Sequence, residues 1–349
     1  MTIPQVSVVM AVFNGERFVD DAIESIVQQT FKDLELIIVD DGSTDGTPAI
    51  LQDWAQRDSR IRVLAQENSG RPAVARNRGL ELARGSFVTF LDGDDLFHPD
   101  KLAVQVQVFN EFPLVGVVFH DFRWFPSGTQ PEGVEPRLRS SGFLDRARKV
   151  LVQQPSLDGN LYLGTADLIK FMSIDTIGMH TSSVAVRREV LSERTPPGFR
   201  EDLPSAEDID LWLRLARVTP VAYIDLPLSH YRFHSESWMS LTSLRALAHG
   251  SFLVKGQMLT RVREILTQDE WQINRPRIAS YWSDLGYQCF VAGLTREART
   301  CYACSLKTLP SLRVLKRAGV SFLPRQLVLA YWRRTGGGET TLRPRPDTC

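Results

Sequence analysis

The feature that most constrains the fold is a regular alternation of buried-strand and helix patterns through the first 120 residues. Apolar, β-branched runs occupy residues 6–13, 34–40, 61–65, 87–91 and 115–119, and helical patterns fill the intervals between them. A near-continuous apolar run indicates a strand that is buried on both faces, as in a parallel sheet. The alternation therefore predicts an α/β fold, a doubly wound and mostly parallel sheet with helices on both faces.

The rest of the chain changes character twice. Residues 126–142 are rich in Pro, Gly and Ser, which predicts a mobile loop. From about residue 243 onward the periodicity is helical almost to the end, and the last dozen residues have the composition of a disordered tail. We therefore expect one domain over residues 1–240, a helical C-terminal extension over 241–335 and a disordered tail over 336–349.

Charge is balanced over the whole chain but not along it. Lys plus Arg and Asp plus Glu both number 41, so nothing global indicates a nucleic-acid partner. Residues 296–349, however, hold 11 basic residues against 3 acidic ones. This basic tail has two open interpretations, contact with an anionic membrane surface or packing of its apolar side on the preceding domain.

Cysteine usage and hydropathy indicate the compartment. All four cysteines lie at or beyond residue 289, so no disulfide framework holds the first domain, and a reducing compartment fits. Cys301 and Cys304 form a CxxC without a second ligand pair of that spacing, which favours a plain helix face over a zinc site. The first residues lack a basic region followed by a cleavable apolar segment, and no apolar run approaches about 20 residues, so we expect neither a leader nor a membrane-spanning helix. We expect a cytoplasmic protein, either free or peripheral on the inner face of the membrane.

Two acidic clusters follow predicted strands, "VDDGSTDGT" after the second and "LDGDD" after the fourth. Ligands of open parallel sheets gather at the carboxyl ends of strands. Adjacent carboxylates such as Asp92, Asp94 and Asp95 repel one another unless a cation compensates, and Mg²⁺ or Mn²⁺ takes oxygen ligands of this kind. The alternative is that these acids end a strand and cap the helix predicted from Pro99.

Other phosphate-binding patterns are missing. No GxGxxG follows the first strand, and no GxxxxGK[ST] occurs in the chain. A phosphatase of the haloacid dehalogenase type would place Thr or Val soon after the second Asp of its motif, where this chain has Asp95 and Leu96. The acidic clusters therefore do not belong to these classes.

Three stretches together resemble a family 2 glycosyltransferase with the Rossmann-like GT-A fold. They are "VSVVMAVFNGERFVDDAIESIVQQTFKDLELIIVDDGSTDGT", "NSGRPAVARNRGLELARGSFVTFLDGDDLFHPDKL" and "GFREDLPSAEDIDLWLRLARV", in the order and spacing of that family. The resemblance covers about residues 5–235. It implies a nucleotide diphosphate sugar as donor, held by residues 1–120, and an acceptor held by residues 121–240.

The resemblance also implies site residues. Those expected to bind the donor nucleotide are Ala11, Val12, Phe13, Asn14, Glu16, Asp40, Asp41, Arg76, Asp92 and Gly93. Two of them have open alternatives, since Phe13 could simply be core and Arg76 could be an ordinary exposed helix arginine. The expected ligands of Mn²⁺ or Mg²⁺ are Asp94 first, then Asp92 and Asp95, with His234 as a weaker candidate.

A carboxylate in the downstream "ED" pair, Glu207 and Asp208, is implied as the base that takes the acceptor proton, with Asp208 preferred. The alternative for this pair is a capping box that begins at Ser205. His180 receives no role, and Trp212 is expected in the core.

The resemblance implies an inverting, metal-dependent enzyme that moves a sugar from a donor, expected to be UDP-linked, to a hydroxyl of a saccharide or lipid-linked acceptor. Two alternatives remain. One is a sugar-nucleotide nucleotidyltransferase, although its glycine-rich, lysine-bearing N-terminal loop is replaced by "AVFNGERF". The other is an inactive sugar-nucleotide binding or scaffold protein.

Overall fold

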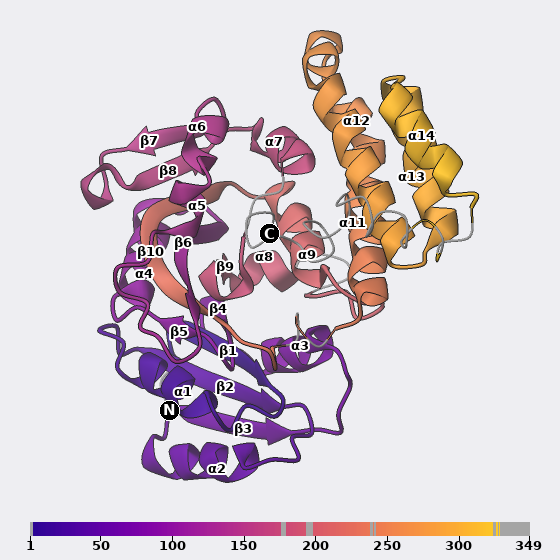
Figure 1. The fold of residues 1–349 in the computed structure, drawn as a ribbon. Helices are drawn as coiled ribbons and strands as arrows, with labels where there is room; N and C mark the ends of the chain where they lie inside the picture. The colour runs from indigo at the N-terminus through magenta and orange to yellow at the C-terminus, as the bar shows by residue number, and fades with distance from the viewer. Residues whose placement is uncertain are drawn as a thin grey trace. The chain divides into compact units, whose positions relative to one another are not determined.

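A computed structural model describes residues 3–175, 179–192, 198–237, 240, 242–323, 326 and 328. Its centre is one mixed sheet with the strand order β3-β2-β1-β4-β9-β6-β10-β8-β7, and β5 pairs with β10 outside this path (Figure 1). The strands are β1 Val6–Val12, β2 Leu34–Asp40, β3 Ile61–Ala65, β4 Phe87–Asp92, β5 Leu96–Phe97, β6 Val117–Pro126, β7 Leu151–Gln154, β8 Leu161–Gly164, β9 Ala185–Arg187 and β10 Val221–Phe233.

The described helices fall into two groups along the chain. The first group is α1 Val19–Val27, α2 Thr47–Arg57, α3 Pro72–Leu82, α4 Lys101–Glu111, α5 Arg137–Ser140, α6 Phe143–Ala147, α7 Leu168–Ile174, α8 Arg188–Ser192 and α9 Glu207–Ala216, with short 3₁₀ turns η1 Leu157–Gly159 and η2 Thr181–Ser183. The second group is α11 Leu244–Ile265, α12 Gln268–Val291, α13 Thr295–Thr308 and α14 Leu312–Val320.

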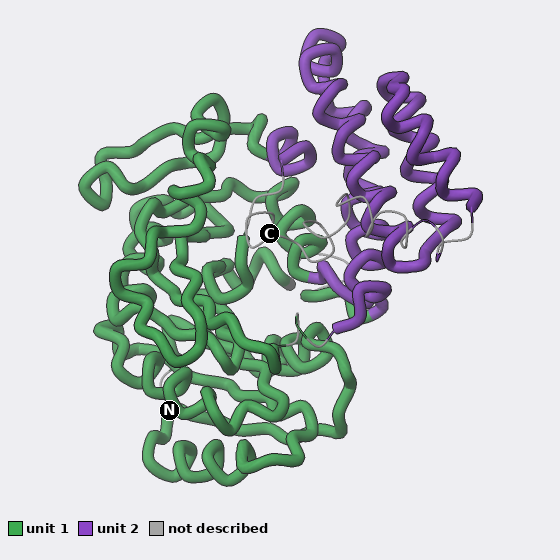
Figure 2. Tube along the Cα trace, in the orientation of Figure 1, with its two compact units in different colours: residues 1–168, 179–201, 208–241 green, residues 169–178, 202–207, 242–349 purple. Residues whose placement is uncertain are grey.

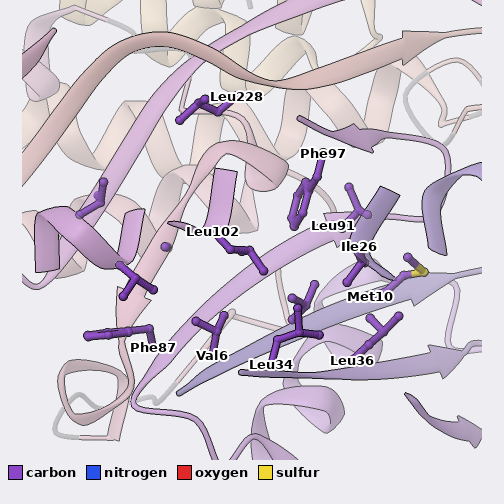
Figure 3. Close-up of a cluster of buried hydrophobic side chains, with 14 of the residues drawn as sticks. Val6, Met10, Ile26, Leu34, Leu36, Phe87, Leu91, Phe97, Leu102 and Leu228 are labelled. Carbon is purple, nitrogen blue, oxygen red and sulfur yellow. The ribbon is translucent and has the colours of Figure 1, made fainter. Parts of the chain in front are cut away.

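The first half of the sheet confirms the predicted alternation. β1 is parallel to both β2 and β4, and β2 is parallel to β3, while helices pack on both faces of these strands. Alternate residues of β1, such as Val6 and Met10, pack in a core with Ile26 of α1 and Leu102 of α4 (Figure 3). Leu51 of α2 belongs to the same core. On the other face, a side chain at Gly79 of α3 would come within 2.4 Å of Val9, so the helix lies directly on the strand. This is the mostly parallel α/β sheet that the sequence predicts.

The second half of the sheet departs from a simple parallel pattern. β9 is antiparallel to both β4 and β6, whereas β6 and β10 are parallel to each other. The loop predicted over 126–142 contains α5, and Pro136 forms a bridge with Arg123 of β6. The prediction of a loop is therefore wrong for residues 137–140.

The chain forms two compact units (Figure 2). Unit 1 comprises residues 1–168, 179–201 and 208–241, and unit 2 comprises 169–178, 202–207 and 242–349. Unit 2 has its own core, in which α12 packs against α13, and Cys301 and Cys304 both lie on α13 as predicted. The predicted tail, 336–349, lies outside the described residues, and the division at residue 240 stays a prediction. None of the described helices is long and apolar enough to cross a bilayer.

Candidate active site

The predicted donor residues gather where β1, β2 and β4 end. In register, Ala11 of β1 lies beside Asp92 of β4, and Val12 lies beside Asp40 of β2. β2 lies on one side of β1 and β4 on the other, so this is a point where strand order reverses, the usual place for a ligand in an open α/β sheet. Gly93 is required by the crowding here, because a Cβ would stand 2.9 Å from Val12 Cγ2.

The loop after β1 is hydrogen-bonded to the loop after β2. Asn14 Oδ1 accepts from the backbone N–H of Thr44 at 2.8 Å, and Glu16 Oε2 accepts from Gly46 at 2.5 Å. Thr47 Oγ1 accepts from the backbone N–H of Gly15 at 2.8 Å, so its hydroxyl joins the two loops, and α2 has no side-chain cap bond at its start. Phe13, the first residue after β1, is 50% exposed, which excludes the alternative that it belongs to the core.

Asp40 and Asp41 are both buried at the end of β2. Asp40 Oδ1 accepts from the backbone N–H of Ser43 at 3.0 Å. Asp41 Oδ1 accepts from Gln66 Nε2 at 2.5 Å, and its other oxygen accepts from the Ser69 hydroxyl at 2.9 Å. These bonds fix the Asp41 carboxylate toward the loop that follows β3.

Arg76 and Asp92 form an ion pair beside β4. Arg76 is 6% exposed, so the alternative of an ordinary surface arginine is wrong. Its Nη2 lies 2.6 Å from Asp92 Oδ1, and its guanidinium lies 5.5 Å from the ring centre of Phe199. Burial disfavours the charged form of Asp92, but the charge and hydrogen bond of Arg76 outweigh this and lower its pKa below the ordinary value.

The pKa of Asp95 is shifted in the opposite direction to that of Asp92, although the two residues are only three positions apart. Asp95 is fully buried, and its Oδ2 accepts from the Ser182 hydroxyl at 2.6 Å. Burial, together with the charges of Asp94 and Asp92, raises its pKa well above the ordinary value. Nε2 of His180 lies 3.5 Å from the same Asp95 oxygen. Burial lowers the pKa of His180 to about 4, against the pull of the nearby carboxylates.

Asp94 contacts His234, the histidine expected as a weaker metal ligand. Its Oδ2 lies 2.9 Å from Nε2 of His234, whose ring packs against Phe18 with centroids 4.4 Å apart. Nδ1 of His234 is buried without a hydrogen-bond partner in the described part of the chain. α4 begins at Lys101 with Asp100 at the N-cap and no side-chain cap bond, so the acids do not cap that helix as the alternative required.

The turn η2 links the acidic cluster to the proposed base. Ser182 Oγ bonds Asp95 and accepts from the backbone N–H of Asp92 at 3.2 Å. The preceding residue, Thr181, places its hydroxyl 3.5 Å from Asp208 Oδ2. Asp208 is therefore close to the acids at the end of β4, which a shared reaction centre requires.

Glu207 is buried at the first position of α9 and belongs by its contacts to unit 2. Because α9 begins at Glu207, Ser205 is not at the N-cap position that the capping-box alternative requires. Trp212, farther along α9, is 2% exposed and packs against Phe90 and Phe199, which confirms its expected place in the core.

Within the described residues, one group of acids and histidines has the geometry of a metal site. Single ligand atoms of Asp92, Asp95 and His180 all lie within 4.8 Å of one another. A neutral imidazole and carboxylate oxygens are suitable ligands for a divalent transition metal. The set overlaps the predicted ligands at Asp92 and Asp95, but it contains His180 in place of Asp94 and His234.

Comparison with known proteins identifies the family. The model described as "Glycosyl transferase family 2" matches residues 7–192, more than half of the chain. The chain belongs to this family. The uncharacterised glycosyltransferase EpsJ of Bacillus subtilis (strain 168) is 45% identical over 147 residues, 41% of this chain and 41% of EpsJ. The chain spans less than half the length of the first curated relatives it matches.

Solved structures of glycosyltransferases share the fold. Residues 1–349 of TarS from S. aureus in complex with UDP-GlcNAc align with a TM-score of 0.60 at 18% identity, covering 95% of this chain and 92% of that one. The mannosyltransferase PcManGT from Pyrobaculum calidifontis, in complex with GDP-Man and Mn²⁺, aligns with a TM-score of 0.52 at 18% identity, covering 98% and 85%. This family 2 chain therefore has the predicted GT-A architecture.

Sequence reasoning missed the central place of η2 in the site of this family 2 chain. His180, Thr181 and Ser182 follow β4 by about 90 residues and sit in no recognisable motif. It also missed Arg232, whose Nε donates to the Asp94 carbonyl at 3.0 Å and whose backbone N–H donates to Asp95 Oδ1 at 3.1 Å. The one available signal was "GMHTSS", a polar run ahead of a short strand.

Proposed function

We propose that this chain transfers a sugar, with inversion at the anomeric carbon, from a UDP-linked donor to a hydroxyl of a saccharide or lipid-linked acceptor. The observation that carries the proposal is the short link through Thr181 and Ser182, which joins Asp208 to Asp95 and Asp92. An acceptor hydroxyl needs a base on one side and a stabilised leaving group on the other. The binding of UDP-GlcNAc by TarS supports the nucleotide-sugar donor.

The donor nucleotide is proposed to bind at the ends of β1 and β2. Phe13 is exposed there and offers an aromatic face to the base. Asn14 and Glu16 hold the loop in shape through their bonds to Thr44 and Gly46, so they act by positioning the backbone. The strand ends beneath the nucleotide are proposed to line the donor site through Ala11, Val12, Asp40, Asp41 and Gly93.

The residues present fit a divalent metal, Mn²⁺ or Mg²⁺. Among the described residues, the basic side chain that approaches the buried carboxyl of Asp95 is that of His180, and burial together with repulsion from the acidic neighbours disfavours the charge of Asp95. Asp92, Asp95 and His180 would hold the ion, with Asp94 and His234 beside them. When bound, such an ion supplies positive charge for the departing diphosphate. The complex of PcManGT with Mn²⁺ supports this assignment.

Asp208 is proposed to take the proton from the acceptor hydroxyl. One-step attack from the face opposite the diphosphate inverts the anomeric configuration. The Asp208 carboxylate also accepts from its neighbour's backbone N–H, that of Ile209, at 2.7 Å, which orients the side chain. Glu207 is buried beside it and is proposed to support this orientation.

The test is metal-dependent binding of nucleotides. UDP, GDP and CDP are titrated into the full chain with and without Mn²⁺, and UDP is expected to bind most tightly and only weakly without metal. Asp92→Asn and His180→Ala should remove the dependence on metal, while Asp53→Asn, an exposed acid of α2, should leave it unchanged. Binding of UDP to the unmodified chain with equal affinity in metal and in chelator would refute the metal site.

A peripheral membrane contact of a cytoplasmic enzyme is proposed for the end of unit 2. α14 and the residues after it expose Leu312, Leu315, Phe322 and Leu323, and the exposed basic residues Arg313 and Lys316 lie among them. Apolar side chains beside basic ones suit an anionic bilayer surface. Flotation with phosphatidylglycerol vesicles at low and high salt tests this, and recovery of the chain at the bottom of the gradient in both would reject it.

A further inference from the structure

Beyond the acidic cluster, aromatic side chains line the ends of two neighbouring strands. Trp124 of β6 and Tyr231 of β10 are partners in register, with ring centroids 5.7 Å apart. Phe233, two residues on along β10, packs edge-on against Trp124 at 5.8 Å. We call Trp124, Tyr231 and Phe233 the aromatic wall. Because alternate residues of a strand share a face, the wall stands on one face of the sheet.

The aromatic wall is contiguous with the candidate active site. Tyr231 meets the ring of His180 edge-on at 4.7 Å between centroids, and His180 is a member of the candidate metal group. The residue after the wall, His234, contacts Asp94. Both Tyr231 and the residue after Phe233 therefore lie next to groups that would face the donor diphosphate, and the wall borders the acidic cluster.

Parts of the wall are accessible and one polar group in it is unsatisfied. Phe233 is 47% exposed, although apolar side chains of this size are usually buried. The indole Nε1 of Trp124 is buried and has no hydrogen-bond partner among the described residues. A buried donor without an acceptor is costly, and such groups are rare in folded proteins. An oxygen of a ligand that packs on the wall would supply the acceptor that this N–H lacks.

The backbone around the wall is held in place. Ser127 N–H donates to the Phe233 carbonyl at 2.9 Å, and Arg123 Nε donates to the Val134 carbonyl at 3.0 Å. Farther along, the Asp121 carboxylate accepts from the backbone N–H groups of Leu138 and Arg139 at 2.7 and 2.9 Å, which fixes the start of α5. This brings the guanidinium of Arg137 to 5.2 Å from the Trp124 ring centre.

We propose that the aromatic wall is the acceptor subsite and that it binds a sugar ring of the acceptor. The inference rests on the proposed function, because it takes the acids beside His180 as the donor end of the reaction. A pyranose has an apolar face of C–H groups and a polar edge of hydroxyls. The wall offers a similar division, with the half-exposed ring of Phe233 as an apolar surface and the unsatisfied indole N–H of Trp124 as a polar group beside it. A hydrocarbon chain would leave the indole donor unsatisfied, so the wall favours a saccharide over a bare lipid.

The experiment measures binding of defined probes to the full chain in the presence of UDP and Mn²⁺. The probes are methyl glycosides of glucose, galactose and N-acetylglucosamine, observed by saturation-transfer NMR, with octanol as an apolar probe. Trp124→Ala is expected to weaken binding of the best glycoside about tenfold, and Phe233→Ala by a smaller factor, since each removes a stacking surface. Trp124→Phe should recover part of the loss. Leu114→Ala, which removes an 83% exposed apolar side chain elsewhere on unit 1, is the control.

Affinity for UDP is measured on the same samples, so that failure of the subsite and failure of the donor site give different results. Normal UDP binding with glycoside affinities unchanged by Trp124→Ala and Phe233→Ala would overturn the subsite and leave the donor proposal standing. The same holds if octanol binds through Trp124 and no glycoside does, or if no probe binds. Loss of metal-dependent UDP binding in the unmodified chain would remove the proposed function and this inference together. If Trp124→Ala does not fold, Phe233→Ala decides, because its side chain is half exposed.

Discussion

At the scale of single residues, three aspartates of one motif are placed in three different environments. Asp92 is paired with Arg76 and its pKa is lowered, whereas Asp95 is buried among acids and its pKa is raised. Asp94, between them, contacts His234. Because successive residues at a strand end point in different directions, spacing in the sequence identifies the acids but not their roles. Their partners come from α3, η2 and the end of β10.

The division of roles within the "ED" pair gives a first prediction. Asp208→Asn should lower turnover of a sugar-nucleotide donor and acceptor by about 10²–10⁴-fold, the usual contribution of a general base. Affinity for UDP should be unchanged, because the substitution keeps the shape of the side chain. Steady-state kinetics together with calorimetric titration of UDP measure both. Glu207→Gln is the control, and a larger loss of turnover in Glu207→Gln than in Asp208→Asn would reverse the assignment.

Glu35 of β2 gives a prediction about acid stability. Burial raises its pKa, but hydrogen bonds from Arg84 and Ser7 outweigh burial and hold the pKa below the ordinary value of a glutamate. The carboxylate accepts from Ser7 Oγ at 2.7 Å and from Arg84 Nη2 at 2.7 Å. A lowered folded-state pKa means that Glu35 stabilises the fold above the unfolded-state value, and that this contribution is lost as pH falls through the folded-state value.

Glu35→Gln should therefore reduce the free energy of unfolding by about 1–3 kcal/mol at neutral pH, the cost of an impaired buried network. The difference from the unmodified chain should shrink below the folded-state pKa, where both side chains are neutral. Urea unfolding at a series of pH values measures it. Glu24→Gln, an exposed acid of α1, should show no comparable change; a difference for Glu35→Gln that stays constant from neutral to acid pH would contradict the linkage.

At the scale of elements, strands are predicted well from the sequence where apolar residues follow one another without interruption, and poorly where polar residues or proline interrupt them. β1, β2 and β4 appear as apolar runs because both of their faces are covered, and the ends of β1 to β4 are observed within one residue of their predicted positions. β10 was not predicted, since Pro227 and its polar residues interrupt the pattern and its pairing with β6 shifts register there. β7 and β8 are four residues each and partly exposed. Their pairing comes from tertiary contacts that no local pattern records.

The contact between α12 and α13 gives a prediction at this scale. A Cβ at Gly286 of α12 would lie 2.8 Å from Tyr302 Cε1 and 3.1 Å from Cys301 Cβ, both on α13. Gly286→Ala should therefore destabilise unit 2 by about 1–3 kcal/mol through overpacking. Gly319→Ala is the matched control, because a Cβ there meets nothing within 4 Å and alanine favours a helix by about 0.5–1 kcal/mol. Thermal unfolding of both variants decides, and equal stabilities would show that α12 can move away from Tyr302.

At the scale of the whole molecule, the order of residues along the chain does not follow the order of the units. Segments 169–178 and 202–207 belong to unit 2, although they lie within the stretch that builds unit 1. The sequence predicts one boundary near residue 240, because the periodicity changes there from alternating strands and helices to helices alone. The insertions are not visible, since a seven-residue helix such as α7 has no compositional difference from its neighbours.

The segment 169–178 gives the last prediction, which concerns whether unit 2 is complete without it. Ile174 of α7 is 8% exposed within the core of unit 2, and Lys170 Nζ lies 3.0 Å from Glu270. Asp175 Oδ2 lies 2.5 Å from Arg277 Nη2. A fragment of residues 242–349 lacks these contacts, so its apolar surface near Ile174 is uncovered. In the full chain, Ile174→Ala should destabilise unit 2 by about 2–5 kcal/mol.

Hydrogen exchange on α12 measures this effect locally, and protection there should fall in Ile174→Ala and fall further in the fragment. Leu114→Ala, which removes an 83% exposed side chain of unit 1, should leave α12 unchanged. If the fragment protected α12 as fully as the whole chain does, residues 169–178 would only lie against a unit that is complete without them. A loss of protection shows instead that the helical unit depends on a segment more than 60 residues earlier in the chain, and that the two units fold from interleaved sequence.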